Sequence, residues 1–256
     1  MPKPKHELSI IIGALNEEKR IGKTLDKLYS YLKAKDWLGN TEVIVVTADA
    51  IDNTHSIVDK KLRRFQHWQH LKPGPRVGKG RDIAHGMQKA LGELCLFMDA
   101  DLATPLEYIS IAKAMHKEFP DDLVIGTRDI KKIHTGLRGA ISLAANVAFK
   151  FGTGLYIRDT QCGFKALDRR YAKKIFDNLR IYGWGFDMEV IALAHALGMN
   201  VRELHIPDWV DMPNSTLPAN RFSVTLETFK ELMQVSWNYR RGSYHRQLGV
   251  SETPVD

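Results

Sequence analysis

Two aspartates one residue apart, Asp99 and Asp101, directly follow the apolar run 94–98. If this run is a buried strand of a parallel sheet, its carboxyl end lies at the edge where such sheets bind ligands. Carboxylate oxygens suit Mg²⁺ and Mn²⁺, which can also take phosphate oxygens as ligands. The pair therefore predicts a divalent-cation site, although the same Asp-x-Asp pattern also occurs by chance in solvated turns.

Glycine and basic residues alternate at Gly78, Lys79, Gly80 and Arg81, where a segment with helical periodicity begins. Glycine lets the backbone approach a ligand closely, and a helix N-terminus beside Lys79 suits a diphosphate. The stretch is not a Walker P-loop, because Gly80 is followed by Arg81 and not by a lysine and a hydroxyl residue. Two interpretations stay open: a diphosphate-binding turn, or a helix start with two solvated cations.

The elements that must position these residues alternate between strand-like and helix-like segments. Apolar runs of strand length lie at 8–12, 42–47, 94–98 and 123–126. Segments with helical periodicity separate them, and this alternation predicts an α/β fold whose mostly parallel sheet has helices on both faces. The second half is less regular, with predicted helices at 141–151 and 187–197 and a strand at 201–206.

Composition and charge narrow the class of protein. The chain has 256 residues, 44% hydrophobic and 26% charged, which excludes wholesale disorder. Its net charge of +7 indicates an anionic partner, such as nucleic acid, a phosphorylated substrate or an acidic membrane. The sequence has no helix-turn-helix, zinc-binding or RNP pattern, so we do not expect nucleic acid as a partner. Two cysteines fit a reducing cytosol, and no run approaches the roughly 18 apolar residues of a membrane span.

Taken in order along residues 8–217, the motifs resemble family 2 glycosyltransferases of the GT-A type. The matching stretches in the first half are Ile-Ile-Ile at 10–12 with Asn-Glu-Glu at 16–18, Gly-Lys-Gly at 78–80 and Phe-Met-Asp-Ala-Asp at 97–101. Two later stretches, Arg-Asp-Thr-Gln-Cys-Gly-Phe-Lys at 158–165 and Gly-Trp-Gly-Phe-Asp-Met-Glu at 183–189, are similar to motifs of the dolichyl-phosphate glucose synthases and their prokaryotic relatives.

The resemblance implies a GT-A, Rossmann-like fold and an inverting enzyme that moves a hexose, with UDP-glucose as the expected donor, to a polyprenyl phosphate. It implies Mg²⁺ or Mn²⁺ as the cofactor, held by Asp99 and Asp101. The nucleotide sugar would be bound by Leu15, Glu17, Asp49, Lys79, Gly80, Asp99 and Ala100. The resemblance implies that Arg128 faces the acceptor or donor phosphate. It places Asp159, Asp187 and Glu189 around the sugar and the attacking oxygen, with Asp159 as base or orienting carboxylate.

Two departures from the family pattern keep alternatives open. Thr47 and Ala48 stand where relatives carry an aspartate expected to bind the nucleobase, and Asp49 could substitute for it after a small loop shift. After the last strand, Asn214-Ser215-Thr216-Leu217 stands where relatives carry a Ser-Lys. The missing lysine favours a soluble or glycan acceptor, and the missing aspartate favours a catalytically silent nucleotide-sugar binder.

The chain is predicted to divide into a catalytic domain, 1–220, and a C-terminal amphipathic helix with a basic tail, 221–256. One apolar stripe is formed by Phe222, Leu226, Phe229, Met233 and Trp237. Basic residues follow at Arg240, Arg241, His245 and Arg246. This pattern is typical of a helix lying in an anionic membrane interface, but a stripe packed on the domain is the alternative. We expect a cytoplasmic protein whose membrane contact, if any, is peripheral.

Overall fold

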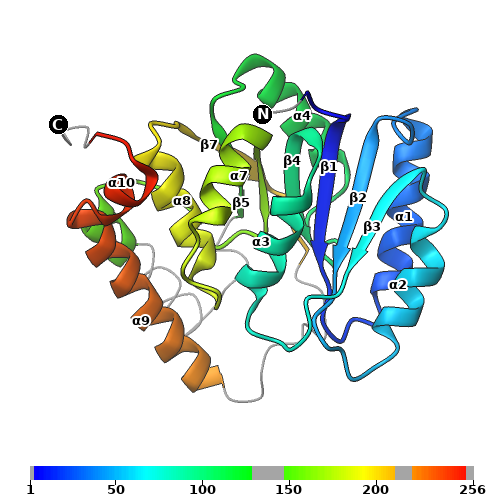
Figure 1. The fold of residues 1–256 in the computed structure, drawn as a ribbon, viewed down its shortest axis with the longest axis horizontal. Helices are drawn as coiled ribbons and strands as arrows, with labels where there is room; N and C mark the ends of the chain where they lie inside the picture. The colour runs from blue at the N-terminus through cyan, green and yellow to red at the C-terminus, as the bar shows by residue number, and fades with distance from the viewer. Residues whose placement is uncertain (1–2, 129–146, 211–220, 252–256) are drawn as a thin grey trace.

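The strands of the chain form one sheet in the computed structural model, which describes residues 3–128, 147–210 and 221–251. Within these residues the sheet has seven strands in the order β3-β2-β1-β4-β6-β5-β7 (Figure 1). Their bounds are β1 His6–Gly13, β2 Thr41–Val46, β3 His67–Leu71, β4 Gly92–Asp99, β5 Leu123–Arg128, β6 Phe164–Asp168 and β7 Val201–Ile206. The predicted mostly parallel α/β fold is confirmed.

Strand β6 is the exception to parallel pairing. It lies between β4 and β5 and runs antiparallel to both, with Leu96 opposite Ala166. Its amino end therefore lies at the edge where the parallel strands have their carboxyl ends, so residues just before Phe164 come close to residues just after β4. Neither this strand nor β3 is among the strands predicted from the sequence.

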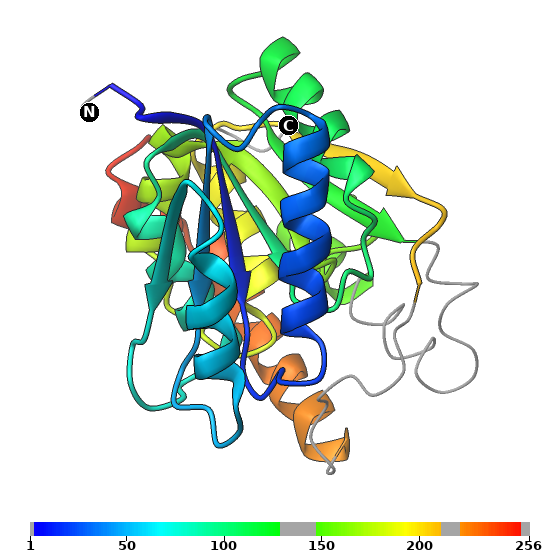
Figure 2. The same ribbon diagram turned by 90° about the vertical axis from the view of Figure 1, so that its right-hand side faces the viewer.

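Helices cover both faces of the sheet, because alternate residues of each strand point to opposite sides (Figures 1 and 2). Ile10 and Ile12 pack against one layer, and Ile11 packs against the other. The first layer contains α1 Ile21–Ala34, α2 Thr54–Leu62 and α4 Glu107–Glu118. The second contains α3 Lys79–Lys89, α7 Arg169–Asp177 and α8 Phe186–Ala196.

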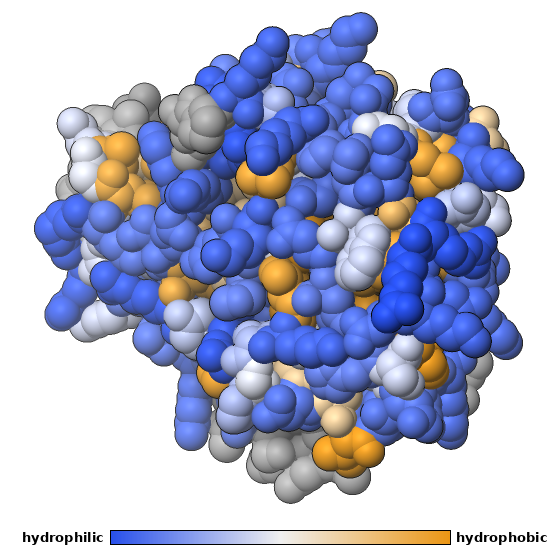
Figure 3. Space-filling model, turned by 45° about the vertical axis from the view of Figure 1, so that its right-hand side comes forward, coloured by the Kyte–Doolittle hydropathy of each residue, from blue (hydrophilic) through white to orange (hydrophobic). Residues whose placement is uncertain are grey.

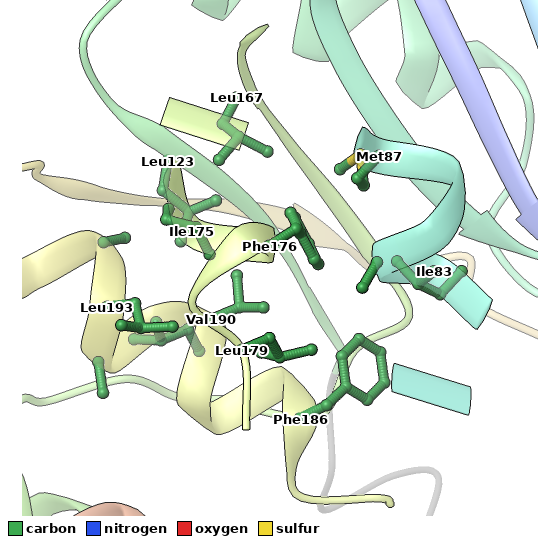
Figure 4. Packing of buried hydrophobic residues seen from close by; sticks show 14 of the residues in the cluster. Ile83, Met87, Leu123, Leu167, Ile175, Phe176, Leu179, Phe186, Val190 and Leu193 are labelled. Carbon is green, nitrogen blue, oxygen red and sulfur yellow. The ribbon is translucent and has the colours of Figure 1, made fainter. Parts of the chain in front are cut away.

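The second layer holds the beginning of α3 firmly against the sheet. Phe186 of α8 and Phe176 of α7 are directed toward Ile83 and Met87 of α3 (Figure 4), and all four are fully or almost fully buried. Outside this core, the face shown in Figure 3 is mostly hydrophilic, and its hydrophobic side chains lie in small, separate patches. The start of α3, where Lys79 lies, is thus attached to a rigid part of the molecule.

The C-terminal segment packs on the second layer through two helices, α9 Arg221–Arg240 and α10 Ser243–Leu248. Their inward side is formed by buried Leu232, Val235, Tyr239 and Tyr244. The predicted stripe is not on that side: Phe229, Met233 and Trp237 are 50%, 52% and 57% exposed. For these three residues the packing alternative is wrong. The side chains of Phe222 and Leu226, and the predicted boundary at residue 220, lie outside the described residues.

The structure also bears on one predicted helix and on the question of a membrane span. The predicted helix at 141–151 is observed from 147 to 153, and its predicted start lies outside the described residues. Among the described residues, no helix combines the length and apolar character that a membrane span requires.

Candidate active site

Lys79, Asp99 and Asp101 come together where β4 ends and α3 begins. Gly13 of β1 pairs with Asp99, so the loops after these two adjacent strands share one edge of the sheet. Nζ of Lys79 lies 2.5 Å from Oδ1 of Asp99. Burial alone would lower the pKa of Lys79, but Asp99 and then Asp187 raise it, so this lysine stays charged. The edge therefore carries a fixed cation among carboxylates.

Asp101 lies within the same electrostatic cluster. Its Oδ1 accepts a hydrogen bond from the backbone N–H of Ala103 at 3.0 Å. Burial, and then the nearby charge of Asp99, raise the pKa of Asp101. Two mutually repelling, half-buried carboxylates favour a bound cation. Their hard oxygens fit Mg²⁺ or Mn²⁺ completed by phosphate oxygens and water. Among the described residues, no group of three or more His, Cys, Asp or Glu side chains forms a complete metal cage.

Gly163 shows why the segment before β6 needs a residue without a side chain. A Cβ atom on Gly163 would lie 2.1 Å from Oδ2 of Asp99 and 2.5 Å from its Cγ. The glycine thus lets residues 159–163 pass directly over the Asp99 carboxylate. Gly163 belongs to the motif at 158–165 but had no predicted role; a glycine between Cys162 and Phe164 was the available signal.

Arg128 and Asp159 form a bidentate ion pair beside this carboxylate. Nε of Arg128 lies 2.5 Å from Oδ2 of Asp159, and Nη2 lies 3.0 Å from Oδ1. The backbone N–H groups of Arg128 and Gln161 also donate to Asp159, which is 2% exposed. Both Asp159 oxygens are therefore engaged in orienting Arg128 and this loop, which favours the orienting role over the base.

Asp187 pairs with a buried lysine, Lys165, that was not among the predicted site residues. Nζ of Lys165, on β6, lies 2.5 Å from Oδ1 of Asp187 and donates to the carbonyl of Cys162 at 2.8 Å. Burial raises the pKa of Asp187, while Lys165 and then Lys79 act in the opposite direction. The pair holds the start of α8 against β6, close to Lys79. The position of this lysine at the end of the motif at 158–165 was the available signal in the sequence.

Glu189 lies on the same helix as Asp187 but not in this cluster. Its Oε2 accepts hydrogen bonds from the backbone N–H groups of Arg180 and Ile181 at 2.8 and 2.7 Å, and its Oε1 accepts one from the Tyr244 hydroxyl. The residue is fully buried. Glu189 therefore holds the loop before α8, and a place beside the sugar stays a prediction.

The residues expected around the nucleoside lie in the loops after β1 and β2. Leu15 and Glu17 are half-buried, and Glu17 forms a two-contact ion pair with Arg20 at 2.7 Å. Asp49 is exposed, and its backbone N–H donates to the carbonyl of Gly74 at 3.0 Å. Oδ1 of Asn16 accepts a hydrogen bond from Ile51, which ties the two loops together. Binding of the nucleoside by Leu15, Glu17 and Asp49 stays a prediction.

Two histidines contact Thr47, one of the two residues that stand where an aspartate was expected. Oγ1 of Thr47 lies 2.7 Å from Nε2 of His70 and 3.1 Å from Nδ1 of His55. Nδ1 of His70 in turn lies 2.6 Å from Oδ1 of Asp59. Burial lowers the pKa of His70 despite Asp59, so its neutral ring donates to Asp59 and accepts from Thr47. Ala48 is fully buried beside this network.

Gly80 and Ala100 have structural contacts of their own. The N–H of Gly80 donates to the carbonyl of Tyr182 at 2.9 Å, and a Cβ on Gly80 would lie 2.5 Å from that of Phe186. The carbonyl of Ala100 accepts a hydrogen bond from the Thr24 hydroxyl of α1. The first contact holds the backbone beside Lys79, and the second holds the backbone beside Asp99.

Three comparisons with known proteins identify the family and the fold. The family model described as "Glycosyl transferase family 2" matches residues 9–176. A dolichyl-phosphate beta-glucosyltransferase of Trichomonas vaginalis is 31% identical over 246 residues, covering 93% of this chain and 75% of the relative. The enzyme of that name from Homo sapiens is 28% identical, covering 94% and 78%.

The solved structures give the same fold at lower identity. Glucosyl-3-phosphoglycerate synthase from Mycobacterium tuberculosis, crystallised with Mn²⁺, UDP and glucosyl-3-phosphoglycerate, superposes with a TM-score of 0.64. The two sequences are 16% identical, and the alignment covers 97% of this chain and 82% of the other. At this identity the likeness concerns the fold alone.

Proposed function

The chain belongs to glycosyl transferase family 2, and from that premise we propose that it transfers glucose from UDP-glucose to a polyprenyl phosphate of the dolichyl type. The observation that carries the proposal is the gathering of Lys79, Asp99 and Asp101 beside the Arg128–Asp159 pair at one edge of the sheet. The names of the relatives support the choice of donor and acceptor.

On the donor side, Asp99 and Asp101 would hold Mg²⁺ or Mn²⁺ against the diphosphate. A divalent cation bound there supplies positive charge that stabilises the departing nucleoside diphosphate. Lys79 adds a second positive charge at the N-terminus of α3, where backbone N–H groups also favour an anion. Leu15, Glu17 and Asp49 would form the walls of the nucleoside pocket.

The acceptor phosphate needs nearby cations more than it needs a general base. A phosphate monoester has a second pKa of about 6 and is already largely ionised at neutral pH. Two anions must then approach each other, and Arg128, held in place by Asp159, offsets their repulsion. In-line attack by the phosphate oxygen on the anomeric carbon breaks the bond to the diphosphate and inverts that centre.

Contact with the acceptor's membrane is proposed to be peripheral and to involve the outer side of α9. Phe229, Met233 and Trp237 are exposed there, and the Arg241 guanidinium lies 4.0 Å from the centre of the Trp237 ring. Exposed Lys230 adds positive charge. Aromatic and basic residues on one side of a helix suit an anionic bilayer surface, where each cation contributes about 1 kcal/mol. The cytoplasmic face is the expected location.

A soluble phosphorylated acceptor is the second candidate, because the M. tuberculosis proteins of the same fold are named glucosyl-3-phosphoglycerate synthases. One experiment distinguishes the two. Radiolabelled UDP-glucose and Mn²⁺ are incubated with the protein and either polyprenyl phosphate in vesicles or 3-phosphoglycerate. We expect label in the organic phase with the lipid. Label only in the aqueous product would favour the soluble acceptor, and donor binding without release of UDP would indicate a silent binder.

A further inference from the structure

The loop between α7 and α8 is held by two carboxylates through its backbone. Glu189 of α8 accepts hydrogen bonds from the N–H groups of Arg180 and Ile181. Glu231 of α9 accepts one from Gly185 at 2.7 Å, and the N–H of Gly183 also donates to it. We call residues 180–185 the clamp loop. Each of its ends is therefore held by an acidic side chain.

The opposite side of the clamp loop touches the N-terminus of α3. The carbonyl of Tyr182 accepts the N–H of Gly80 at 2.9 Å. A Cβ atom on Gly78 would lie 2.1 Å from that same carbonyl oxygen, so loop and helix are in direct contact. The Trp184 ring centre lies 6.0 Å from Nζ of Lys79. A shift of the clamp loop must therefore move Lys79 or break these contacts.

Glu231 lies on the side of α9 that contacts the clamp loop. It is half-buried and faces the clamp loop, whereas Phe229 and Met233, two positions to either side, are exposed. A Cβ on Gly183 would lie 2.1 Å from Oε1 of Glu231, and one on Gly185 would lie 2.7 Å from its Cβ. The two glycines of the Gly-Trp-Gly motif thus allow α9 to approach the loop closely. Helix α9 begins at the edge where β1 and β4 end (Figures 1 and 2).

We propose that Glu231 is a positioning residue that couples α9 to the diphosphate-binding end of α3 through the clamp loop. When the outer side of α9 docks on an anionic lipid surface, the helix is fixed, Glu231 holds Gly183 and Gly185, and Lys79 is fixed for the donor diphosphate. Docking at the membrane thereby strengthens donor binding. This inference rests on the proposed function for the identity of the donor and of the lipid surface.

The test uses three variants. Glu231→Ala removes the carboxylate, and Glu231→Gln keeps an acceptor oxygen. The control, Glu227→Gln, removes an exposed charge one turn earlier on the same helix. Backbone hydrogen exchange of residues 180–185 is measured without donor, with and without vesicles containing phosphatidylserine. Vesicles should slow this exchange in the parent and in Glu227→Gln. In Glu231→Ala, exchange should be fast and unaffected by vesicles, although the variant sediments with them as the parent does.

Kinetics separate positioning from a general loss of stability. At a temperature where all variants are folded, Glu231→Ala should raise the KM for UDP-glucose about tenfold, because small displacements of a binding group are costly, while Glu231→Gln stays near the parent. A KM for Glu231→Ala within a factor of about two of the parent would overturn the proposal. So would unchanged exchange of the clamp loop when the parent binds vesicles. If UDP-glucose is not a donor at all, the proposed function fails, and the exchange experiment still decides whether α9 and the clamp loop are coupled.

Discussion

Replacing Gly163 by alanine is expected to displace the Asp99 carboxylate without changing any charge. The new Cβ would lie 2.1 Å from Oδ2, 2.5 Å from Cγ and 2.6 Å from Oδ1 of Asp99. Carbon and oxygen atoms approach to about 3.3 Å even in close C–H···O contacts, so the carboxylate must move by about 1 Å. Gly163 is not among the residues with positive φ, so the steric contact alone determines the effect.

Such a movement separates Asp99 from Nζ of Lys79, now 2.5 Å away, and from a cation shared with Asp101. A misplacement of about 1 Å can cost about 10²-fold in rate, and we expect a loss of this size in kcat for glucose transfer. Release of UDP is measured against Mn²⁺ concentration, and the metal requirement should rise together with the loss of rate.

The matched control is Gly39→Ala, an exposed glycine whose Cβ would make only an ordinary 3.5 Å contact with Gln66. It should retain the activity of the parent. Thermal unfolding of both variants shows whether the fold survives. The reasoning is refuted if Gly163→Ala keeps its rate within a factor of about three and an unchanged Mn²⁺ requirement.

Three further predictions concern the metal, a buried acid and α9. Asp101→Ala should lower the transfer rate by about 10²–10³-fold with little change in Tm, since a charge-stabilising element is lost. Activity within a factor of about two of the parent, also after treatment with a chelator, would contradict this role. Burial raises the pKa of Asp82 to about 6, and its Oδ1 has no hydrogen-bond partner among the described residues. The native state therefore binds this proton more tightly than the unfolded state, so the free energy of unfolding falls as pH rises from about 4 to 6. In urea unfolding, Asp82→Asn should be more stable than the parent by up to about 3 kcal/mol at pH 8, and equally stable near pH 4. Met233→Ser with Trp237→Ser should weaken sedimentation with anionic vesicles at unchanged Tm, because both side chains are exposed, and equal sedimentation would exclude this side of α9.

The sequence predicted best those parts whose signal is local. A continuous apolar run at 94–98 is typical of a strand buried on both faces, and β4 was therefore found together with Asp99 and Asp101 at its end. Strand β6 was missed because Lys165 interrupts its apolar pattern. That lysine is buried only because Asp187, 22 positions later, pairs with it.

The partners of individual carboxylates could not be predicted, because they depend on tertiary contacts. Glu189 was expected near the sugar from its motif, yet its hydrogen bonds go to the backbone of 180–181 and to Tyr244. The apolar stripe of the last helix was found, but which side of α9 packs depends on the surface of α8. The structure shows that Leu232 and Val235 fill this contact, and not the stripe.

The place of β6 between β4 and β5 also determines the order in which the protein can form during synthesis. Strands β1 to β4 pair only with one another until β6 is made, and both partners of β5, β6 and β7, come later in the chain. Roughly 65 residues separate the end of β4 from β6, or roughly 3–13 s of translation at about 5–20 residues per second. During that time the backbone N–H and C=O groups along one side of β4 have no partner strand, and a strand of another chain can pair with them. A ribosome paused after β5 would therefore present an aggregation-prone half-sheet, which already carries Lys79 and Asp99 but still lacks Asp159, Gly163 and Lys165.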